Sequence, residues 1–308
     1  MQNGHNMGTE PCGVIVMDKH EGVSSFRMIQ ILRKMFDTKK VGHTGTLEPL
    51  ATGVLPVLVG RAVKASEYIM SEDKEYSAVM RLGIETDTED ITGNVIRSDS
   101  AIPGEDEVYR VCESFCGEIS QIPPMYSAIW QDGRRLHEIA REGGVVEREA
   151  RKVTVSRLRV KKIDEATYSL DVACSKGTYI RTLCADIGKA LGCGAAMASL
   201  RRTRSGNFTL DRAHTIAELE DLSVEERRAL LGDVYKRQVE SAFVQYREIE
   251  LSDFYHRLAS CGAEIYLKKI RTHAEPGETV RMKHDGEFFA LGRVEEFPDG
   301  TAIRPVKQ

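Results

Sequence analysis

Several features that define common protein classes are missing from this sequence of 308 residues. The seven cysteines are odd in number and form no C-x-x-C pair, so we predict reduced thiols rather than a disulfide framework or a zinc site. No apolar run is long enough to span a bilayer, and the first residues lack the basic and apolar regions of a signal peptide. No glycine-rich nucleotide-binding loop follows a predicted strand. We therefore expect a cytoplasmic globular protein that does not associate with a membrane and needs no metal or cofactor.

An excess of positive charge is also missing, because the net charge is −4. Overall charge therefore does not indicate a nucleic-acid-binding protein. Local clusters do, since basic residues gather in three groups: Arg33, Lys34, Lys39 and Lys40; Arg134, Arg135, Arg141, Arg148, Arg151 and Lys152; and Arg201, Arg202 and Arg204. Each group alone is typical of a solvated surface, but together they predict phosphate binding.

The stretch KVGHTGTLEPLATGVLPVLVG, from Lys40 to Gly60, combines a lone imidazole, His43, with a lone carboxylate, Glu48. It also holds three glycines, Gly42, Gly45 and Gly53. Glycine permits backbone angles that other residues resist, and Pro49 restricts the residue before it. The composition predicts a tight loop that holds a carboxylate rigidly beside a buried strand. The alternative is a surface loop with a solvated glutamate.

Within this stretch, GHTGTLEPLATGVLP resembles the catalytic loop of the bacterial tRNA pseudouridine-55 synthases, the TruB family, whose pattern is G-H-T-G-x-L-D-P-x-A-x-G-x-L-P. Other family motifs are similar to DKHEGVSS, to KEYSAVMRLG with TDTED, to QIPPMYSAIWQDGRRLHEIAREG, to CSKGTYIRTLCADIG and to LRRTRSG. The catalytic aspartate of the family is Glu48 here. His20, Trp130 and His137 stand where the family usually has proline, lysine and tyrosine.

The resemblance implies the site. Glu48 stands for the catalytic aspartate, Arg181 is its cationic partner, and Tyr76 stacks on the flipped-out base. The other expected substrate contacts are His43, Tyr179, Leu200, Asp90 and Lys19. The expected RNA contacts are Arg134, Arg141, Arg151, Arg201, Arg202, Arg204 and Trp130. The implied partner is the T-arm of tRNA, bound by a monomer without a guide RNA or a cofactor.

Pseudouridine formation breaks the N1–C1′ bond of uridine and rejoins the base through C5. The carboxylate acts as a nucleophile, on C1′ or on C6, or as a base on the ribose, and the sequence does not choose among these. A neighbouring cation, Arg181, keeps it ionised. Because Glu48 reaches about 1 Å farther than an aspartate, and about 1 Å of misplacement costs roughly a hundredfold in rate, we expect slow or no catalysis.

Two other functions compete with this one. The first is a catalytically impaired tRNA-binding protein of the same fold, which the replacement at Glu48 favours. The second is a guide-RNA-dependent synthase, which the bacterial-type motifs and the lack of a long basic tail disfavour.

The predicted fold class is α+β, with a central mixed, mostly antiparallel sheet in a pseudouridine synthase domain (1–232) and a small PUA-like β domain (247–308). Expected strands include 13–17, 54–59, 76–82, 153–163 and 168–174, and expected helices include 24–36, 62–70 and 105–115. The segment 233–246 is a linker. Its hexapeptide DVYKRQ is what a transposon mosaic end used in sequencing-library preparation encodes, so we interpret it as an assembly scar.

Overall fold

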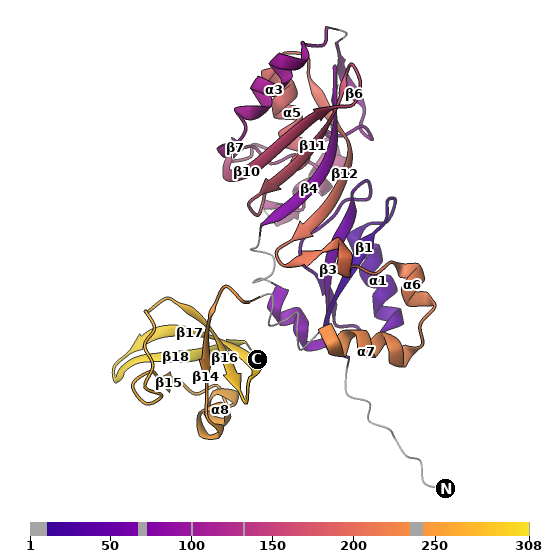
Figure 1. Ribbon diagram of the computed structural model, residues 1–308. Coiled ribbons are helices and arrows are strands. Elements are labelled where there is room, and N and C mark those ends of the chain that lie inside the picture. The colour runs from indigo at the N-terminus through magenta and orange to yellow at the C-terminus, as the bar shows by residue number, and fades with distance from the viewer. Residues whose placement is uncertain (1–10, 67–72, 100, 132, 235–242, 308) are drawn as a thin grey trace.

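The computed structural model describes residues 11–66, 73–99, 101–131, 133–234 and 243–307. Figure 1 shows a tall sheet flanked by helices, with a smaller sheet domain beside one end. The far end of the helix expected at 62–70 and most of DVYKRQ lie outside the described residues. Within the described ranges, none of the helices has both the length and the apolar character needed to cross a membrane.

The large sheet follows the order β1, β3, β12, β4, β11, β10, β7. These strands are Gly13–Lys19, Thr52–Val59, Ala195–Ser205, Lys74–Leu82, Thr167–Cys174, Arg151–Lys162 and Gly117–Gln121; β2 (Val41–His43) pairs with β3, and β13 (Phe208–Thr209) pairs with β12. The β3–β12 pair is parallel, whereas the other strand pairs of this sheet are antiparallel. The prediction of a mixed, mostly antiparallel sheet is confirmed.

Helices cover the two halves of this sheet separately (Figure 1). The helices α1 (Ser25–Met35), α6 (Ile216–Glu220) and α7 (Val224–Val234) pack by β1 and β3, and α3 (Glu105–Glu113) and α5 (Ile180–Ala190) pack by β4, β10 and β11. Each half has its own apolar core, and Leu200 packs against both cores. The junction of the two halves is therefore where β3 and β12 run in parallel.

The helix α1 shows how the sequence sets these elements. Ser24 caps it, since its hydroxyl accepts a hydrogen bond from the Arg27 amide at 3.1 Å. The stripe expected to be buried contained Ile31, but Ile29 is buried in its place, beside Met28. The expected helix after β3 begins as a 3₁₀ helix, η1 (Gly60–Ala65).

The remaining elements of the large domain are short. The hairpin β5 (Ile84–Thr86) and β6 (Val95–Ser98) follows β4, and β8 (Trp130–Gln131), β9 (Arg134–Arg135) and α4 (Leu136–Arg141) lie between β7 and β10. The 3₁₀ turn η2 (Leu210–Arg212) follows β13. All seven cysteines, each within the described ranges, are free thiols.

The C-terminal sheet has the order β14 (Arg247–Glu250), β16 (Thr279–His284), β17 (Glu287–Phe297), β18 (Gly300–Lys307) and β15 (Ile265–Tyr266). This small β domain is consistent with the expected PUA-like fold. The sequence pattern did not reveal α8 (Asp253–Ser260), because the surrounding residues alternate as strands do. One apolar cluster joins the domains: Phe243 and Leu291 belong to the same buried group as Val14 and Leu58 of the large sheet.

Candidate active site

The candidate site is built on the loop between β2 and β3, which carries Glu48. Gly45 and Gly53 have φ values of 100° and 99°, in the region that favours glycine. A Cβ on Gly53 would lie 2.2 Å from the carbonyl oxygen of Arg202, so only glycine lets β3 and β12 approach this closely. Gly42 lies in β2 and does not have a positive φ, so the prediction that it needs this freedom is wrong.

Hydrogen bonds hold the backbone on both sides of Glu48. The Ser25 hydroxyl lies 2.8 Å from both the amide nitrogen and the carbonyl oxygen of Leu47. The Gly22 amide donates to the Pro49 carbonyl oxygen at 2.8 Å. Because both neighbours are anchored, the position of the Glu48 carboxylate depends on the length and rotamer of its own side chain.

Arg181, in the first turn of α5, faces this loop and donates a hydrogen bond to the Glu48 carboxylate. Its side chain is only 5% exposed. It also donates to the carbonyl oxygens of Thr88 at 2.8 Å and Tyr126 at 2.7 Å, and it lies 3.4 Å from the Asp90 carboxylate. The Glu48 side chain remains 36% exposed. The carboxylate therefore has a fixed cationic partner and stays open on another side.

Burial and charge have opposite effects on this carboxylate. Burial is the largest effect and raises the pKa of Glu48, whereas the Arg181 guanidinium lowers the pKa. The neighbouring carboxylates of Asp90 and Glu89 raise it further. Arg181 thus favours the ionised form, as expected, but the net pKa of Glu48 lies above its ordinary value.

Tyr76 and Leu200 come from adjacent strands next to this pair. In the β4–β12 register, Arg202 lies opposite Tyr76 and Leu200 lies opposite Ala78. Tyr76, Leu200 and Leu50 of the loop between β2 and β3 pack against the same apolar core. Burial raises the pKa of the Tyr76 hydroxyl, so Tyr76 is a neutral, partly buried ring at the junction of the two halves.

Tyr179 immediately precedes α5 and is held by a buried glutamine. Its amide donates to Gln121 Oε1 at 3.1 Å, and Gln121 Nε2 donates to its carbonyl oxygen at 3.2 Å. Burial raises the pKa of the Tyr179 phenol, and the charges of Arg151, Arg181 and Glu48 also act on this group. The structure therefore brings Tyr179 to the same place as Glu48 and Arg181, although these segments are far apart in the sequence.

Lys19, predicted to bind substrate, is fully buried at 0% exposure. Its Nζ donates to the carbonyl oxygens of Val23 at 2.7 Å and His20 at 2.9 Å, and reaches that of Pro49 at 3.4 Å. Burial lowers the pKa of Lys19 to about 8. This contradicts a direct substrate contact, because the ammonium group joins the loop between β1 and α1 to the loop between β2 and β3 instead.

Arg202, predicted to contact RNA, is 1% exposed. Its Nε donates to the Val54 carbonyl oxygen at 2.7 Å and its Nη2 to that of Gly45 at 3.2 Å. It lies beside the Tyr76 hydroxyl, and burial lowers its pKa. This burial contradicts a phosphate contact. Arg202 instead supports the catalytic loop and Tyr76 from within the protein.

Asp90, also predicted to bind substrate, is buried and directed at the protein. One carboxylate oxygen accepts hydrogen bonds from the Thr92 amide at 2.9 Å and the Thr88 hydroxyl at 3.0 Å, and the other faces Arg181. It therefore orients Arg181 rather than the substrate.

At His43, burial and the Arg202 charge lower the pKa, and Nδ1 has no partner among the described residues.

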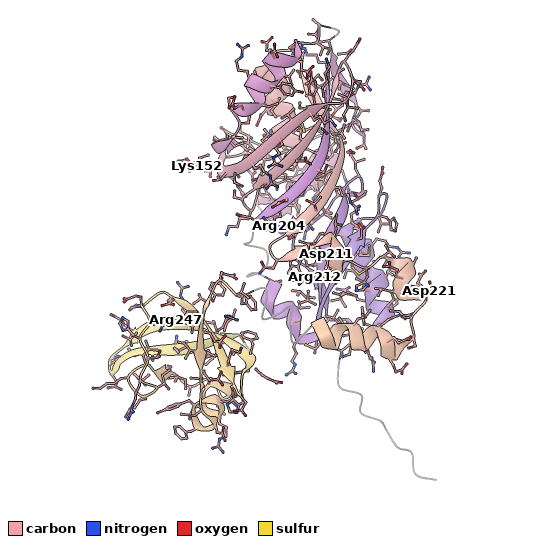
Figure 2. The ribbon with its side chains drawn as sticks, in the orientation of Figure 1. Lys152, Arg204, Asp211, Arg212, Asp221 and Arg247 are labelled. Carbon is pink, nitrogen blue, oxygen red and sulfur yellow. The ribbon has the colours of Figure 1, made fainter. Side chains whose placement is uncertain are left out.

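The other basic residues of β12 are partly exposed but paired. Arg201 lies 2.7 Å from the Asp18 carboxylate, and Arg204 lies 2.8 Å from that of Glu75. Figure 2 shows Arg204 near the middle of the large domain and Lys152 at its edge, so basic side chains are spread over the sheet. The group at 201–204 therefore consists of one buried and two paired arginines, and the phosphate contacts of Arg201 and Arg204 remain predictions.

The second basic group is more accessible. Arg141 and Arg151 are exposed, and Arg134 forms an exposed ion pair with Glu142 at 2.6 Å. Trp130, in the same region, is 62% exposed. Their predicted RNA contacts remain predictions.

Outside this site, Asp253, His284 and Asp285 of the C-terminal domain place their ligand atoms within 4.8 Å of one another. They could hold a cation by geometry, but exposed carboxylates often gather without one.

The sequence analysis missed three supporting residues of the site: Ser25, Gln121 and Tyr126. Gln121 opens the Q-x-P-P motif, which was the available signal. Ser25 acts through its hydroxyl on the backbone of Leu47, and Tyr126 acts through its own carbonyl oxygen, so residue type alone reveals neither contact.

Residues 33–180 match the TruB family pseudouridylate synthase N-terminal domain, and residues 181–243 match the tRNA pseudouridylate synthase B C-terminal domain. The chain belongs to the TruB family.

The sequences of known relatives match this chain over nearly its whole length. The tRNA pseudouridine synthase B of Clostridium tetani is 40% identical over 282 residues, which cover 91% of this chain and 95% of that protein. The tRNA pseudouridine synthase B of Chromohalobacter salexigens is 44% identical over 291 residues, covering 94% and 92%. The predicted class of enzyme, a tRNA pseudouridine synthase, is thereby confirmed at the level of the family.

Solved structures support the fold. A Cbf5–Nop10–Gar1 complex matches with a TM-score of 0.71 and 28% identity, over 96% of this chain and 84% of that chain. An H/ACA RNP bound to a substrate RNA containing 2′-deoxyuridine matches with a TM-score of 0.69 and 26% identity, again over 96% and 84%. The predicted fold class is therefore confirmed.

Proposed function

We propose that this chain converts uridine 55 in the T-loop of tRNA to pseudouridine, with Glu48 as the reacting carboxylate. The observation that carries the proposal is the Glu48–Arg181 pair: the carboxylate is partly exposed, and its cationic partner is buried and fixed by three further contacts. The chain acts as a monomer on the T-arm without a guide RNA. Residues 1–232 form the catalytic domain, and residues 247–308 form a second RNA-binding domain.

The reaction is an isomerisation, so it needs no external redox partner. The N1–C1′ bond breaks, the base turns, C5 bonds to C1′, the C5 proton leaves to solvent and N1 gains a proton. Glu48 attacks C1′ or C6, or takes a proton from the ribose. Arg181 orients Glu48 and stabilises its charge. Tyr76 stacks on the extruded uracil, and Leu200 and Tyr179 line the pocket around it.

A second function, a catalytically impaired tRNA-binding protein, is favoured by the extra methylene of Glu48. The loop backbone is anchored on both sides of this residue, and Arg181 is held from several directions, so neither can shift to absorb the added length. The two functions therefore share the same fold and the same RNA contacts. They differ in whether the carboxylate oxygen reaches its target.

One experiment separates them. Unmodified tRNA transcript carrying tritium at C5 of uridine is incubated with the purified protein, and release of tritium to water is followed while the modified position is mapped. Release with modification at position 55 supports the first function. Saturable binding without release in prolonged single-turnover incubations supports the second, and modification at other uridines alone would refute the assigned target.

A further inference from the structure

Three consecutive residues of the loop between β5 and β6, Thr88, Glu89 and Asp90, lie against the first turn of α5. The outer two contact Arg181: the Thr88 carbonyl oxygen accepts a hydrogen bond at 2.8 Å, and the Asp90 carboxylate lies at 3.4 Å. The side chain of the middle residue contacts the neighbour of Arg181 instead, because Glu89 Oε2 accepts a hydrogen bond from the Thr182 hydroxyl at 2.6 Å. The loop therefore contacts two successive residues of α5.

The backbone of Glu89 has an unusual conformation for this residue type. Its φ value is 65°, in the left-handed region that residues other than glycine, asparagine and aspartate rarely adopt. Such a conformation persists where the surrounding structure holds it in place. Here the Glu89 amide donates to the Thr86 carbonyl oxygen at 3.2 Å, and the Glu89 carbonyl oxygen accepts from the Met197 amide of β12 at 3.0 Å. The chain therefore turns at Glu89, and groups on both sides of the turn face the same guanidinium.

The N-terminus of α5 needs partners from elsewhere in the chain. Its N-cap residue, Tyr179, makes no side-chain cap among the described residues, and its first turn contains no acidic residue. Glu89 supplies a carboxylate close to the positive end of the helix dipole, where a negative charge is stabilising. Thr182 is only 3% exposed, so its hydroxyl has little access to water and depends on this acceptor. The contact therefore fixes the turn of the helix that carries Arg181.

Glu89 also contributes charge to the active site. Burial is the main reason that the pKa of Glu89 is raised, and the hydrogen bond from Thr182 opposes this effect. The charged groups that act on Glu89 are Arg181, Asp186 and Arg148. Burial is likewise the largest effect that raises the pKa of Glu48, and the carboxylates of Asp90 and Glu89 add to it. Removal of the Glu89 carboxylate should therefore lower the pKa of Glu48.

We propose that Glu89 is a positioning residue of the active site: through its turn and its hydrogen bond to Thr182, it holds Arg181 in the orientation that meets the Glu48 carboxylate. The inference rests on the proposed function, because it takes Glu48 as the reacting carboxylate and Arg181 as its partner. Glu89 acts on the rate through the position of Arg181 and, by its charge, through the ionisation of Glu48, rather than by contact with the uridine.

Single-turnover tritium release tests the positioning. Glu89→Asn suits the left-handed backbone but is too short to reach Thr182, so it should lower the rate by about tenfold while affinity for tRNA changes little. Glu89→Gln keeps the length and an acceptor for the hydroxyl, and it should restore most of the rate. Thr182→Val removes the donor and should lower the rate by a similar factor. Glu113→Asn, which removes an exposed carboxylate of α3, is the matched control.

A double variant shows whether the two residues act together. Glu89→Asn combined with Thr182→Val should be no slower than the slower of the two single variants, because both substitutions remove the same contact. If the two losses multiply instead, the residues act independently and the proposal is overturned. A rate of Glu89→Asn equal to that of wild type would overturn it as well.

The pKa of Glu48 gives a readout that a merely structural role would not move. It is measured by carbon-13 NMR of the Glu48 carboxyl, whose signal is identified by its loss in Glu48→Gln. The other charged residues that act on Glu48, Arg181 and Asp90, are present in every variant. We expect the pKa to fall in Glu89→Gln and to fall less in Glu89→Asn, because a displaced Arg181 stabilises the ionised form less. An unchanged pKa in Glu89→Gln, or an equal shift in both variants, would overturn the proposal.

These measurements keep the proposal separate from the proposed function. If wild type reacts too slowly to follow, the same rate ratios are expected in the Glu48→Asp background, and the NMR titration needs no turnover. Absence of tritium release in both backgrounds refutes the proposed function, whereas the titration still supports or overturns the role of Glu89. Tritium release with an unchanged pKa in Glu89→Gln refutes the role of Glu89 and leaves the proposed function standing.

Discussion

Replacing Glu48 by aspartate should increase the rate of pseudouridine formation. The structure fixes both ends of this contact: Leu47 and Pro49 are anchored by hydrogen bonds to Ser25 and Gly22, and Arg181 is held by the protein on its other sides. The reach of the carboxylate is therefore set by side-chain length. Glu48→Asp shortens it by one methylene, on the order of 1 Å, which is the scale of misplacement that costs roughly a hundredfold.

We expect the rate of Glu48→Asp to exceed that of wild type by at least about tenfold, which corresponds to about 1.4 kcal/mol of activation free energy. Affinity for tRNA should change little, because the substituted side chain contacts Arg181 within the protein. The assay is single-turnover tritium release at saturating protein, which separates the chemical step from binding and product release.

The matched control is Glu48→Gln, which keeps the length and removes the charge. It should be inactive if the carboxylate reacts. Equal rates for wild type and Glu48→Asp, both comparable to ordinary family members, would show that the extra methylene is accommodated and that the geometric argument is wrong. If neither form reacts while both bind tRNA, the defect lies elsewhere in the site, with Trp130 and His137 the next residues to examine.

Three further predictions follow from the described contacts. Burial raises the pKa of Glu48 and catalysis needs its ionised form, so the rate should begin to fall on acidification at a pH above the ordinary pKa of glutamate. A carboxyl group with a raised pKa in the folded protein stabilises the folded state when it becomes protonated. Circular dichroism should therefore show no unfolding caused by this group at that pH. Affinity for tRNA should fall steeply with salt, and Arg141→Gln and Arg151→Gln should each reduce the log–log slope by about one, whereas Arg204→Gln, whose side chain is paired with an acid, should change it less. Arg202→Met should lower the free energy of unfolding in urea by about 1–3 kcal/mol, since it leaves buried carbonyl oxygens without donors, and should reduce the rate more than tRNA affinity; an unchanged rate would refute its support of the loop.

The Glu48–Arg181 pair could be predicted from the sequence because each residue sits in a long, specific motif whose partner is implied by the resemblance. The roles of Lys19, Arg202 and Asp90 could not. Whether a charged side chain faces solvent or the interior depends on strand register and on acids far along the chain, and single-sequence periodicity does not contain that information.

The same limit explains the basic residues of β12. Arg201 is paired with Asp18, which lies in a different strand at the other end of the domain sequence, and Arg202 turns inward because successive residues of a strand alternate between faces. Three arginines within four residues therefore look like one positive surface in the sequence. In the fold it is one buried support and two paired surface residues, so the exposed charges around Arg141 and Arg151 are the better candidates for phosphate contact.

The buried cations lead us to expect that a change at position 48 leaves the rest of the site intact. Lys19 and Arg202 both donate to carbonyl oxygens of the catalytic loop, and neither touches the Glu48 side chain through a hydrogen bond of the described residues. Burying two cations is costly unless such acceptors surround them. The loop is thus held by its backbone, independently of the side chain at 48, so its geometry persists whether that side chain is aspartate or glutamate. An active and an impaired form of this site would therefore share one fold and one mode of tRNA binding, and the rate alone would distinguish them.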